Sequence, residues 1–567
     1  MVKKTVIILA SLLLLMSYTH RMSACTNILV TKGASTDGST LVSYAADSHD
    51  LYGELYYWPG KTYPAGAMLD VYEWDSGKYL GQIPQVPQTY TVFGNMNEHQ
   101  LTIAETTFGG RRELVDTTGL IDYGSLIYIT LQRAKNAREA IKIMTDLVAE
   151  YGYCSGGESF SILDPNEVWI MEMIGKGTNL QTDRKTKQQS NANKGAVWVA
   201  VKIPDGYVSA HANQARIHKF PLNDKENVIY SPDVISFAKS KGYFTGNDAD
   251  FSFCDAYAPL DHSALRACEA RVWSAFRIMN PEMDKHLPFV LGETTEKMPL
   301  YILPTKKVSA ADVKAIMRDV YEGTPLSMTQ DDDPGAGPYR APYRWRPMAW
   351  KIDGKDYFFE RAIATQQTAF SFVAQMRSWL PNPIGGILWF GVDDANMTVF
   401  VPLYMGMQGV PHNFAIGNGD MFEFTWNSSF WVFNWVANQA YHRYNQMIVD
   451  IRKVQQNLEN KFDLYTPVID QAALTLYKEN PDAAKAFLTE YSHTQARITH
   501  ETWKQLGEFL FVKYLDGNLH LEENGVFKRN QHGNPYKTQF PGYSEDFLRN
   551  IVDKTGDRLR VKDIKTN

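Results

Sequence analysis

The chain has 567 residues, with 57 Lys and Arg against 63 Asp and Glu, a formal net charge of -6, and four cysteines. This balance argues against a nucleic-acid-binding protein, which usually presents a basic surface, and so few cysteines argue against a disulfide-built scaffold. Hydrophobic residues at 44% and charged residues at 21% are typical of a packed soluble protein, so neither a disordered chain nor a polytopic membrane protein is expected.

The first 24 residues have the parts of a secretory signal peptide. Lys3 and Lys4 open the chain, an apolar run follows from Val6 to Met16, and a more polar stretch ends in Ala24. As a helix the apolar run would span about 16 Å, roughly half of a membrane core, so a stable membrane span is disfavoured. We expect residues 1–24 to be removed during export to the periplasm or the extracellular space.

Cleavage after Ala24 would make Cys25 the first residue, and three interpretations of it stay open. In an N-terminal nucleophile its thiol attacks the substrate and its own α-amine is the base, since the two groups titrate near pH 8.5 and about 7.7–8.0. In a lipoprotein the cysteine is acylated, which removes that base. In the third, Cys25 is passive. The nucleophile is favoured because Met22 stands where a lipoprotein signal has leucine, and because a β-prone segment rather than a polar tether follows.

The N-terminal half is predicted to be rich in strands. Residues 25–30 and 40–44 are β-prone and flank the turn signal Asp37-Gly38, which indicates a hairpin. Further strands are expected at Tyr90–Phe93, Leu101–Glu105, Val168–Met173 and Val197–Ile203. A helix is predicted from Asn136 to Glu150, because its apolar residues fall on one face: Ala137, Ala140, Ile141, Met144, Leu147 and Val148.

The C-terminal half mixes both kinds of element. A helix is predicted at Ala310–Tyr321, with Ser309 as its N-cap. Strands are expected at 365–376 and 387–404, followed by a mainly helical region at about 429–515. Since strands and helices do not alternate as regular βαβ units, the predicted class is layered α+β.

Common cofactor and catalytic signatures are missing from the sequence. There is no dinucleotide-binding Gly-x-Gly-x-x-Gly after a strand, no P-loop, no His-Glu-x-x-His and no Gly-x-Ser-x-Gly, so we expect neither a metal nor an organic cofactor. The run from Asp331 to Asp333 is interpreted as a solvated acidic loop. Cys254 and Cys268 either form a disulfide or remain buried thiols, and Cys154 is expected to be a small buried side chain.

Several short sequence blocks carry a family resemblance, and they follow one another in this order along the chain: Cys25 to Val30, Asp37-Gly38-Ser39, Ala46-Asp47-Ser48, Met96 to His99, Glu105 to Arg111, Gly157 to Phe160, His211 to Ile217, Ala270 to Trp273 and Trp389 to Asp394. Together they resemble the dipeptidase A family of cysteine peptidases, N-terminal nucleophile hydrolases related to bile-salt hydrolases and penicillin acylases. The resemblance implies a four-layer αββα catalytic domain over residues 25–567. It also implies that Cys25 hydrolyses dipeptides with a free N-terminus.

Three further catalytic residues are implied by this resemblance. Asn213 is the candidate oxyanion donor, Asp47 would orient the nucleophile and its α-amine, and Arg271 would support the site electrostatically. Each also has a structural interpretation: Asp47 as a turn cap, Asn213 as a loop anchor and Arg271 as an ion-pair partner. One departure concerns Tyr44, which stands where many relatives carry an arginine, so that another group would have to stabilise the thiolate.

Substrate-binding candidates come from the same blocks. Glu105 and Glu158 could receive a substrate ammonium group, and Arg111, with Arg112 beside it, could bind a substrate carboxylate. Thr107 occupies the place of a second oxyanion asparagine in the acylase relatives. The expected partners are dipeptides, and a homo-oligomer is left open. The alternatives are an amidase or acylase of the same fold, and a non-enzymatic surface lipoprotein.

Overall fold

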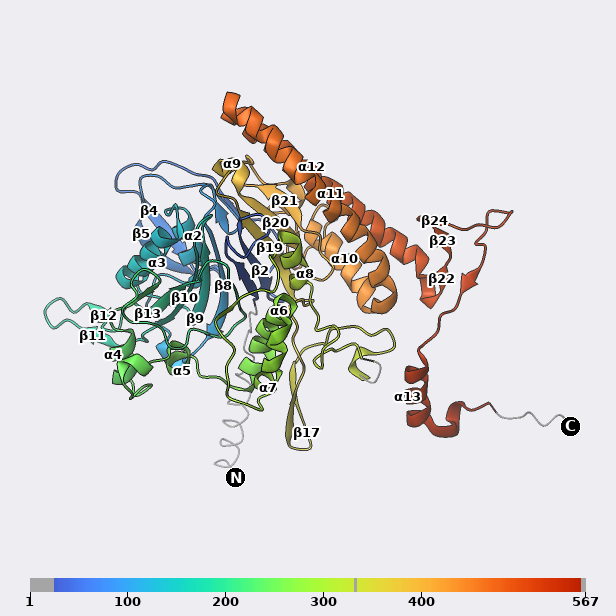
Figure 1. The fold of residues 1–567 in the computed structure, drawn as a ribbon, viewed down its shortest axis with the longest axis horizontal. Coiled ribbons are helices and arrows are strands. Elements are labelled where there is room, and N and C mark those ends of the chain that lie inside the picture. The colour runs from blue at the N-terminus through green and yellow to red at the C-terminus, as the bar shows by residue number, and fades with distance from the viewer. Residues whose placement is uncertain (1–24, 331–333, 562–567) are drawn as a thin grey trace.

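The computed structural model describes residues 25–330 and 334–561, and two antiparallel sheets organise them (Figure 1). The predicted signal peptide and the run Asp331–Asp333 lie outside these residues. Within them, the predicted α+β class with a helical C-terminal region is confirmed.

The first sheet has seven strands with the predicted N-terminal hairpin near its centre. Its order is β16 (Tyr301–Ile302), β14 (Val208–His211), β1 (Asn27–Val30), β2 (Thr40–Asp47), β19 (Thr368–Met376), β20 (Ile387–Val392) and β21 (Val401–Tyr404). Leu29 lies opposite Val42 in the hairpin, and both strands are buried along their whole length. Cys25 and Thr26, directly before β1, are buried as well.

The second sheet has eight strands. Their order is β15 (Val228–Tyr230), β13 (Ala196–Lys202), β10 (Val168–Gly175), β9 (Gly157–Leu163), β8 (Thr102–Gly109), β7 (Met96–Asn97), β6 (Val92–Phe93) and β3 (Tyr57–Trp58). Helices α2 (Tyr123–Leu131) and α3 (Ala137–Tyr151) pack against it. The predicted helix is shifted by one residue, with Asn136 as its N-cap, and the six residues predicted to share one face are the buried ones.

Other helices pack against the seven-stranded sheet. These are α6 (Ala270–Met279), α8 (Ala310–Met317), α10 (Ser429–Tyr441), α11 (Tyr444–Glu479) and α12 (Pro481–Lys513). Ser309 and Asp312 form a capping box at the start of α8, which ends four residues earlier than predicted. The predicted strand 387–404 is in fact two strands, because the chain turns at Asp393, whose φ is 64°.

The two sheets face each other through β1 and β2 on one side and β8 and β9 on the other. Apolar side chains from both sheets form one buried cluster that includes Cys25. The neutral imidazole of His211 on β14 bridges the sheets, since its two nitrogens lie 2.7 Å from the hydroxyls of Thr106 and Ser161. Burial lowers the pKa of His211 to about 3, so the bridge stays uncharged.

Smaller elements surround this core. The helices are α4 (Val234–Ser240), α5 (Phe253–Tyr257), α7 (Leu287–Val290), α9 (Asn382–Gly385) and α13 (Glu545–Thr555). The two-stranded pairs are β4 (Met68–Tyr72) with β5 (Tyr79–Pro84), β11 (Leu180–Thr182) with β12 (Gln189–Asn191), β17 (Ala349–Ile352) with β18 (Lys355–Phe358), β22 (Leu519–His520) with β25 (Thr538–Gln539), and β23 (Glu522–Glu523) with β24 (Val526–Phe527).

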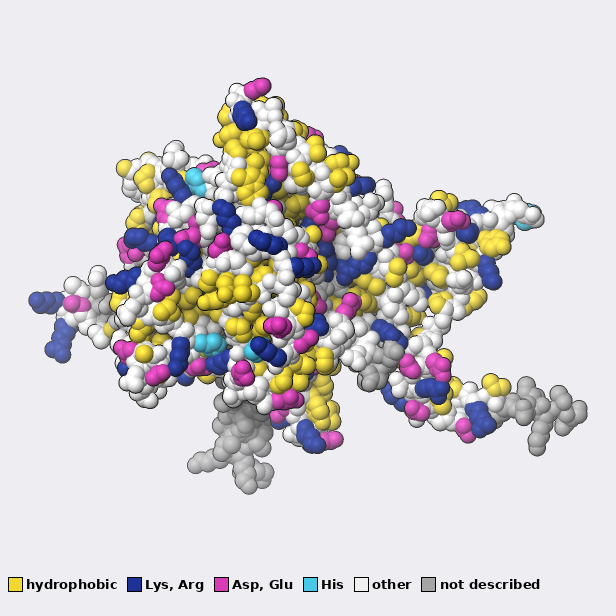
Figure 2. Space-filling model, viewed as in Figure 1, with side chains coloured by type: hydrophobic (Ala, Val, Ile, Leu, Met, Phe, Trp, Pro, Cys, Tyr) yellow, Lys and Arg dark blue, Asp and Glu magenta, His cyan; other side chains and the backbone are white. Residues whose placement is uncertain are grey.

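The chain after α12 forms an arm that extends away from the sheets (Figure 1). None of the side chains of α13 is buried. Acidic and basic side chains are interspersed over the face of the molecule in Figure 2, and the arm stands apart from it. Of the helices in the described part of the chain, none is both long and apolar enough to cross a membrane.

Candidate active site

Strand pairing places Asn213 beside Cys25. Asn27 on β1 lies opposite His211 on β14, and continuing this antiparallel register by two residues sets Cys25 opposite Asn213. The main-chain nitrogen of Cys25 donates to Asn213 Oδ1 at 2.8 Å, and Cys25 is only 1% exposed. Asn213 has a φ of 59°, a left-handed conformation that asparagine tolerates better than most residues. Its Nδ2 donates to the Thr107 carbonyl at 2.8 Å, which fixes the amide.

Arg271 holds the other side of this pair. From the first turn of α6 its Nη1 donates to the Cys25 carbonyl at 2.6 Å and its Nη2 donates to Asn213 Oδ1 at 2.9 Å. Burial lowers the pKa of Arg271 to about 10, which leaves the guanidinium charged at neutral pH. The two ends of Cys25 are therefore fixed by one buried cation and one amide.

The Cys25 thiol faces an acidic group rather than a cation. Its Sγ lies 3.6 Å from Glu105 Oε1 and 3.8 Å from the Tyr44 hydroxyl, which itself donates to Glu105 Oε1 at 2.8 Å. Burial, together with the carboxylates of Glu105 and Asp47, raises the pKa of the Cys25 thiol, and hydrogen bonds with the Asp47 main chain and Tyr44 oppose this rise. The thiol is therefore neutral at rest and needs a base to become a nucleophile.

Glu105 and Glu158 form a buried pair of carboxyl groups. Thr107 on β8 lies opposite Glu158 on β9, and Glu105, two residues from Thr107, shares its face of the sheet. Burial raises the pKa of both groups, that of Glu158 well above the usual glutamate value. Oε2 of each group is buried without a hydrogen-bond partner among the described residues. Two neighbouring buried carboxylates would repel each other, so we expect one of the two groups to hold a proton. Thr107 donates to Glu158 Oε1 at 2.7 Å instead of pointing toward Cys25.

The Asp47 carboxylate does not lie against Cys25. It accepts 2.6 Å hydrogen bonds from Arg361 Nη2 and the Thr368 hydroxyl, and it is fully buried. The expected orienting role would therefore act through the Asp47 main chain, which hydrogen-bonds the thiol.

A cavity of about 380 Å³ opens beside Tyr44 and Glu105. Its other walls include Tyr56, Trp74, Asp75, Tyr123, Tyr128 and Phe370, and His49, Asp50 and Arg346 also line it. Aromatic walls with a few charged groups are typical of a site for a small polar molecule. Cys25 does not itself line the cavity, but both residues that contact its thiol do, so the thiol lies directly behind this part of the wall.

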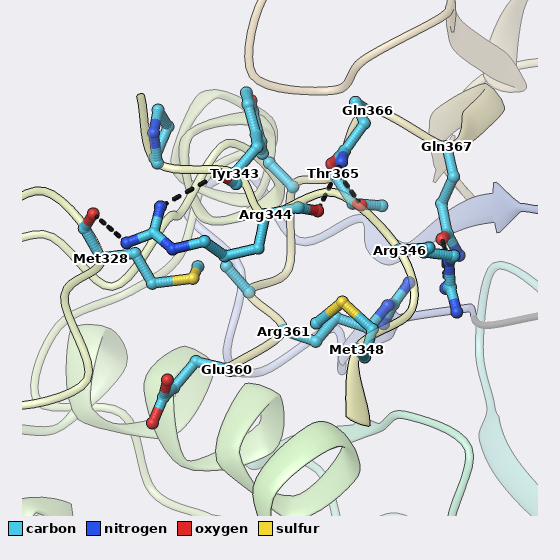
Figure 3. A pocket seen from close by; sticks show the side chains of 13 residues that line it. Met328, Tyr343, Arg344, Arg346, Met348, Glu360, Arg361, Thr365, Gln366 and Gln367 are labelled. Carbon is cyan, nitrogen blue, oxygen red and sulfur yellow. Dashed lines mark hydrogen bonds between the residues drawn. The ribbon is translucent and has the colours of Figure 1, made fainter. Parts of the chain in front are cut away.

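The structure does not bring Arg111 to this cavity. Its Nε donates to the Ala256 carbonyl at 2.7 Å, and its guanidinium lies 3.9 Å from the centre of the Tyr243 ring. Arg346 lines the cavity instead, and sequence reasoning missed it because no local motif marks it. Figure 3 shows Arg346 next to Gln367 in an adjacent pocket that Arg361 also lines. Arg361, the partner of Asp47, was missed for the same reason.

A second cluster of reactive groups lies elsewhere. Ligand atoms of His218, Cys254 and Asp255 lie within 4.8 Å of one another, which would suit a metal ion. The Lys297 ammonium already lies among them, 3.5 Å from His218 Nδ1, 3.9 Å from Cys254 Sγ and ion-paired with Asp255, so a cation would have to displace it. All four cysteines are free thiols, so Cys254 and Cys268 do not form the disulfide that was one alternative. Cys154 is partly exposed rather than buried.

Comparison with known proteins identifies relatives over most of the chain. The profile of peptidase family C69 matches residues 24–457. A probable dipeptidase of Salmonella dublin is 24% identical over 410 residues, covering 68% of this chain and 82% of the relative. A probable dipeptidase of Latilactobacillus sakei is 24% identical over 510 residues, covering 86% and 94%. A dipeptidase of Bifidobacterium longum is 23% identical over 438 residues, covering 68% and 72%.

Proposed function

The chain belongs to peptidase family C69, and on this basis we propose that it is an exported cysteine dipeptidase with Cys25 as its N-terminal nucleophile. The relatives named above as dipeptidases support the substrate class. The observation that carries the proposal is the placement of Cys25: its nitrogen is held by Asn213 and its thiol faces the cavity wall at Glu105.

The base in this proposal is the α-amine that removal of residues 1–24 would create. The nitrogen and Sγ of Cys25 are separated by three covalent bonds, so they lie about 3–4 Å apart in any rotamer. Its N–H donates to Asn213 Oδ1, so this hydrogen bond holds the amine beside the thiol and leaves the nitrogen lone pair to accept a proton. Burial of Cys25 also argues against a lipid anchor, because an acylated Sγ would have to fit between Glu105 and Tyr44.

The proposed reaction has two halves. The α-amine takes the thiol proton as Sγ bonds to the substrate carbonyl carbon, and then gives that proton to the leaving nitrogen as the C–N bond breaks. Water next attacks the thioester and releases the second product, with the amine again accepting and returning a proton. Asn213 Nδ2 is the proposed donor to the oxyanion, and one such donor is typically worth about 10²–10³ in rate. Arg271 keeps Cys25 and Asn213 in register.

Glu105 is proposed to bind the free N-terminus of the substrate. In an amino acid the ammonium nitrogen is two bonds, about 2.5 Å, from the carbonyl carbon that the thiol attacks. Reacting atoms stand about 3–3.5 Å apart before attack, so the ammonium group lies within about 3–6 Å of Sγ. Glu105 Oε1 is 3.6 Å from Sγ, which suits a salt bridge to that ammonium group. Glu158, on the neighbouring strand β9, is the buried acidic neighbour of Glu105.

The remaining expectations are proposals as well. The two sheets with helices against each of them fit the four-layer αββα arrangement of N-terminal nucleophile hydrolases. The proposed compartment is the periplasm or the extracellular space.

Mass spectrometry and activity together test the function. We expect a mature chain that begins at an unmodified Cys25 and hydrolyses free dipeptides faster than N-acylated amino acids. Cys25→Ala should abolish turnover without lowering the melting temperature, and Cys25→Ser should keep at most weak activity because a hydroxyl is far less acidic than a thiol. Diacylglyceryl-modified Cys25, or full activity in correctly processed Cys25→Ala, would refute the mechanism. A preference for N-acylated substrates would indicate an acylase instead.

A further inference from the structure

The cavity beside Cys25 carries opposite charges in different parts of its wall. Glu105 and Asp75 are acidic, and Asp75 accepts a hydrogen bond from Tyr123 at 2.8 Å. Arg346 is the one Lys or Arg among the described residues that line this cavity. It is exposed at the cavity mouth, near the exposed side chains of His49 and Asp50. A molecule with an ammonium group and a carboxylate would match this layout.

Strand β2 runs along the cavity between the acidic part of the wall at Glu105 and the basic part at Arg346. Tyr44 and Ala46 lie on its cavity side, and Tyr44 contacts Glu105. Beyond Ala46, the main-chain carbonyl of Asp47 accepts a 3.3 Å hydrogen bond from Gln367, whose Oε1 accepts a 2.9 Å hydrogen bond from Arg346 Nε. Tyr44 and Asp47 are three residues apart along β2, about 10 Å, and an extended dipeptide spans about 7 Å. Glu105 and Arg346 therefore line the cavity at separate points along β2, on a length scale comparable with that of a dipeptide.

The charge of Arg346 is available for a ligand. Within the described ranges Arg346 forms no ion pair, and its hydrogen-bond acceptor is the neutral amide of Gln367 (Figure 3). The nearby Asp47 carboxylate is already bound by Arg361 and Thr368. Asp50 is the other acidic group at the mouth, where solvent screens it. Both Nε and Nη2 of Arg346 donate to Gln367 Oε1, so Nη1 and the second hydrogen of Nη2 remain to donate to a carboxylate.

We propose that Arg346 binds the C-terminal carboxylate of the substrate and so restricts the enzyme to dipeptides. The inference rests on the proposed function, because it takes Cys25 as the nucleophile and Glu105 as the ammonium site. In a tripeptide the carboxylate lies about 3.5 Å farther along, and a neutral carbonyl takes its place opposite Arg346. A dipeptide amide likewise offers no negative charge there.

Kinetics on three substrates test this role: a dipeptide, the same dipeptide as its C-terminal amide, and the tripeptide extended by one residue. Wild-type enzyme should prefer the free dipeptide. Arg346→Gln should lower kcat/KM for the dipeptide about tenfold, mainly through KM, as expected for loss of a hydrogen bond to a charged group. The kcat/KM for the amide should change less than about twofold, so the variant should lose the preference for the free dipeptide over its amide. Arg346→Lys should recover part of it, and Arg497→Gln, an exposed arginine on α12, is the matched control.

The possible outcomes distinguish a failure of the proposed Arg346 role from a failure of the proposed function. Equal losses for dipeptide and amide in Arg346→Gln, with an unchanged melting temperature, would overturn the carboxylate role and indicate that Arg346 only positions Gln367 and Asp47. Loss of the preference in Arg111→Gln but not in Arg346→Gln would also overturn it. Failure of the wild-type enzyme to hydrolyse dipeptides in a Cys25-dependent way would instead refute the proposed function.

Discussion

The surroundings of Cys25 disfavour its thiolate, because burial and two carboxylates raise the pKa of the thiol. A cation at position 44 would favour the thiolate, and Tyr44 supplies none. The Tyr44 hydroxyl accepts a hydrogen bond from the thiol and donates one to Glu105. The site therefore favours a neutral thiol that loses its proton only during attack, and the need for a neighbouring base is correspondingly strong.

The Glu105–Glu158 pair should make substrate affinity depend on pH. Because the pKa of both groups is raised, the pair becomes fully protonated, and loses its negative charge, at a higher pH than exposed glutamates would. We therefore expect KM for free dipeptides to rise as pH falls through this raised range. Glu105→Gln should raise KM about tenfold or more at neutral pH and flatten its pH dependence. Steady-state kinetics between pH 4 and 8 measure both effects.

The matched control for this prediction is Glu150→Gln, an exposed glutamate at the end of α3. It should leave KM and its pH dependence unchanged. A wild-type KM that is constant over the acid range would contradict the ammonium role of Glu105.

Single residues near Cys25 were predictable only in part. The motif blocks located Cys25, Asn213, Arg271 and Glu105, which the structure does bring together. The partner of Asp47 was not predictable, because Arg361 lies 314 positions away and no local pattern links them. Arg111 stands in a matching block, yet a main-chain carbonyl and an aromatic ring hold its guanidinium away from the cavity.

At the scale of elements, the pairing of β1 with β14 builds the site. The register that sets Cys25 opposite Asn213 depends on the chain adopting a left-handed conformation just past the end of β14. Asparagine serves two needs there, since it tolerates this conformation and its side chain holds the Cys25 nitrogen.

Two substitutions at position 213 should separate these needs. Asn213→Gly keeps the backbone conformation and removes the amide, so it should fold normally and lose about 10²–10³-fold in kcat. Asn213→Ala removes the amide and adds backbone strain, so it should also lower the free energy of unfolding by about 1 kcal/mol relative to the glycine variant. Urea unfolding and single-turnover kinetics measure the two effects. Equal stabilities would argue against strain, and near-normal kcat in the glycine variant would argue against the oxyanion role.

Elements with a strong local signal were predictable, and those set by distant contacts were not. The α3 pattern identified all six buried residues, because an amphipathic period is a local property. The stretch 387–404 reads as one apolar strand, yet Asp393 turns the chain and its carboxyl accepts a hydrogen bond from Asn434 on α10. That stretch is buried on both sides of the turn, so the apolar pattern continues through it and conceals the break.

At the scale of the molecule, the catalytic body and the C-terminal arm differ in packing. Residues 540–561 include the exposed side chains Phe540 and Val552, and α13 buries none of its residues. One contact of this segment with the body is the Tyr543 ring, 6.1 Å from Tyr339. Since so little apolar area is buried in residues 540–561, this segment should contribute little to stability.

Removing residues 540–567 tests this division. We expect unchanged kcat/KM for dipeptides and a melting temperature within about 3 °C of the full chain, which corresponds to about 1 kcal/mol. Differential scanning calorimetry and steady-state kinetics measure the two. The comparable removal of residues 500–567, which cuts into buried Trp503 and Leu510 of α12, should unfold the protein. A large loss of activity from the shorter deletion would show that the arm contributes to the site.

The bond between the Cys25 nitrogen and Asn213 also bears on when the enzyme can act. While residues 1–24 remain attached, that nitrogen belongs to a peptide bond and cannot accept a proton, although it already donates to Asn213 at 2.8 Å. Under the proposed mechanism the newly made chain is thus an inactive precursor, because its active-site residues are in place but the α-amine that serves as the base has not yet been formed. Activity begins with one cleavage, so the peptides of the compartment where the chain is synthesised are protected without any separate inhibitor.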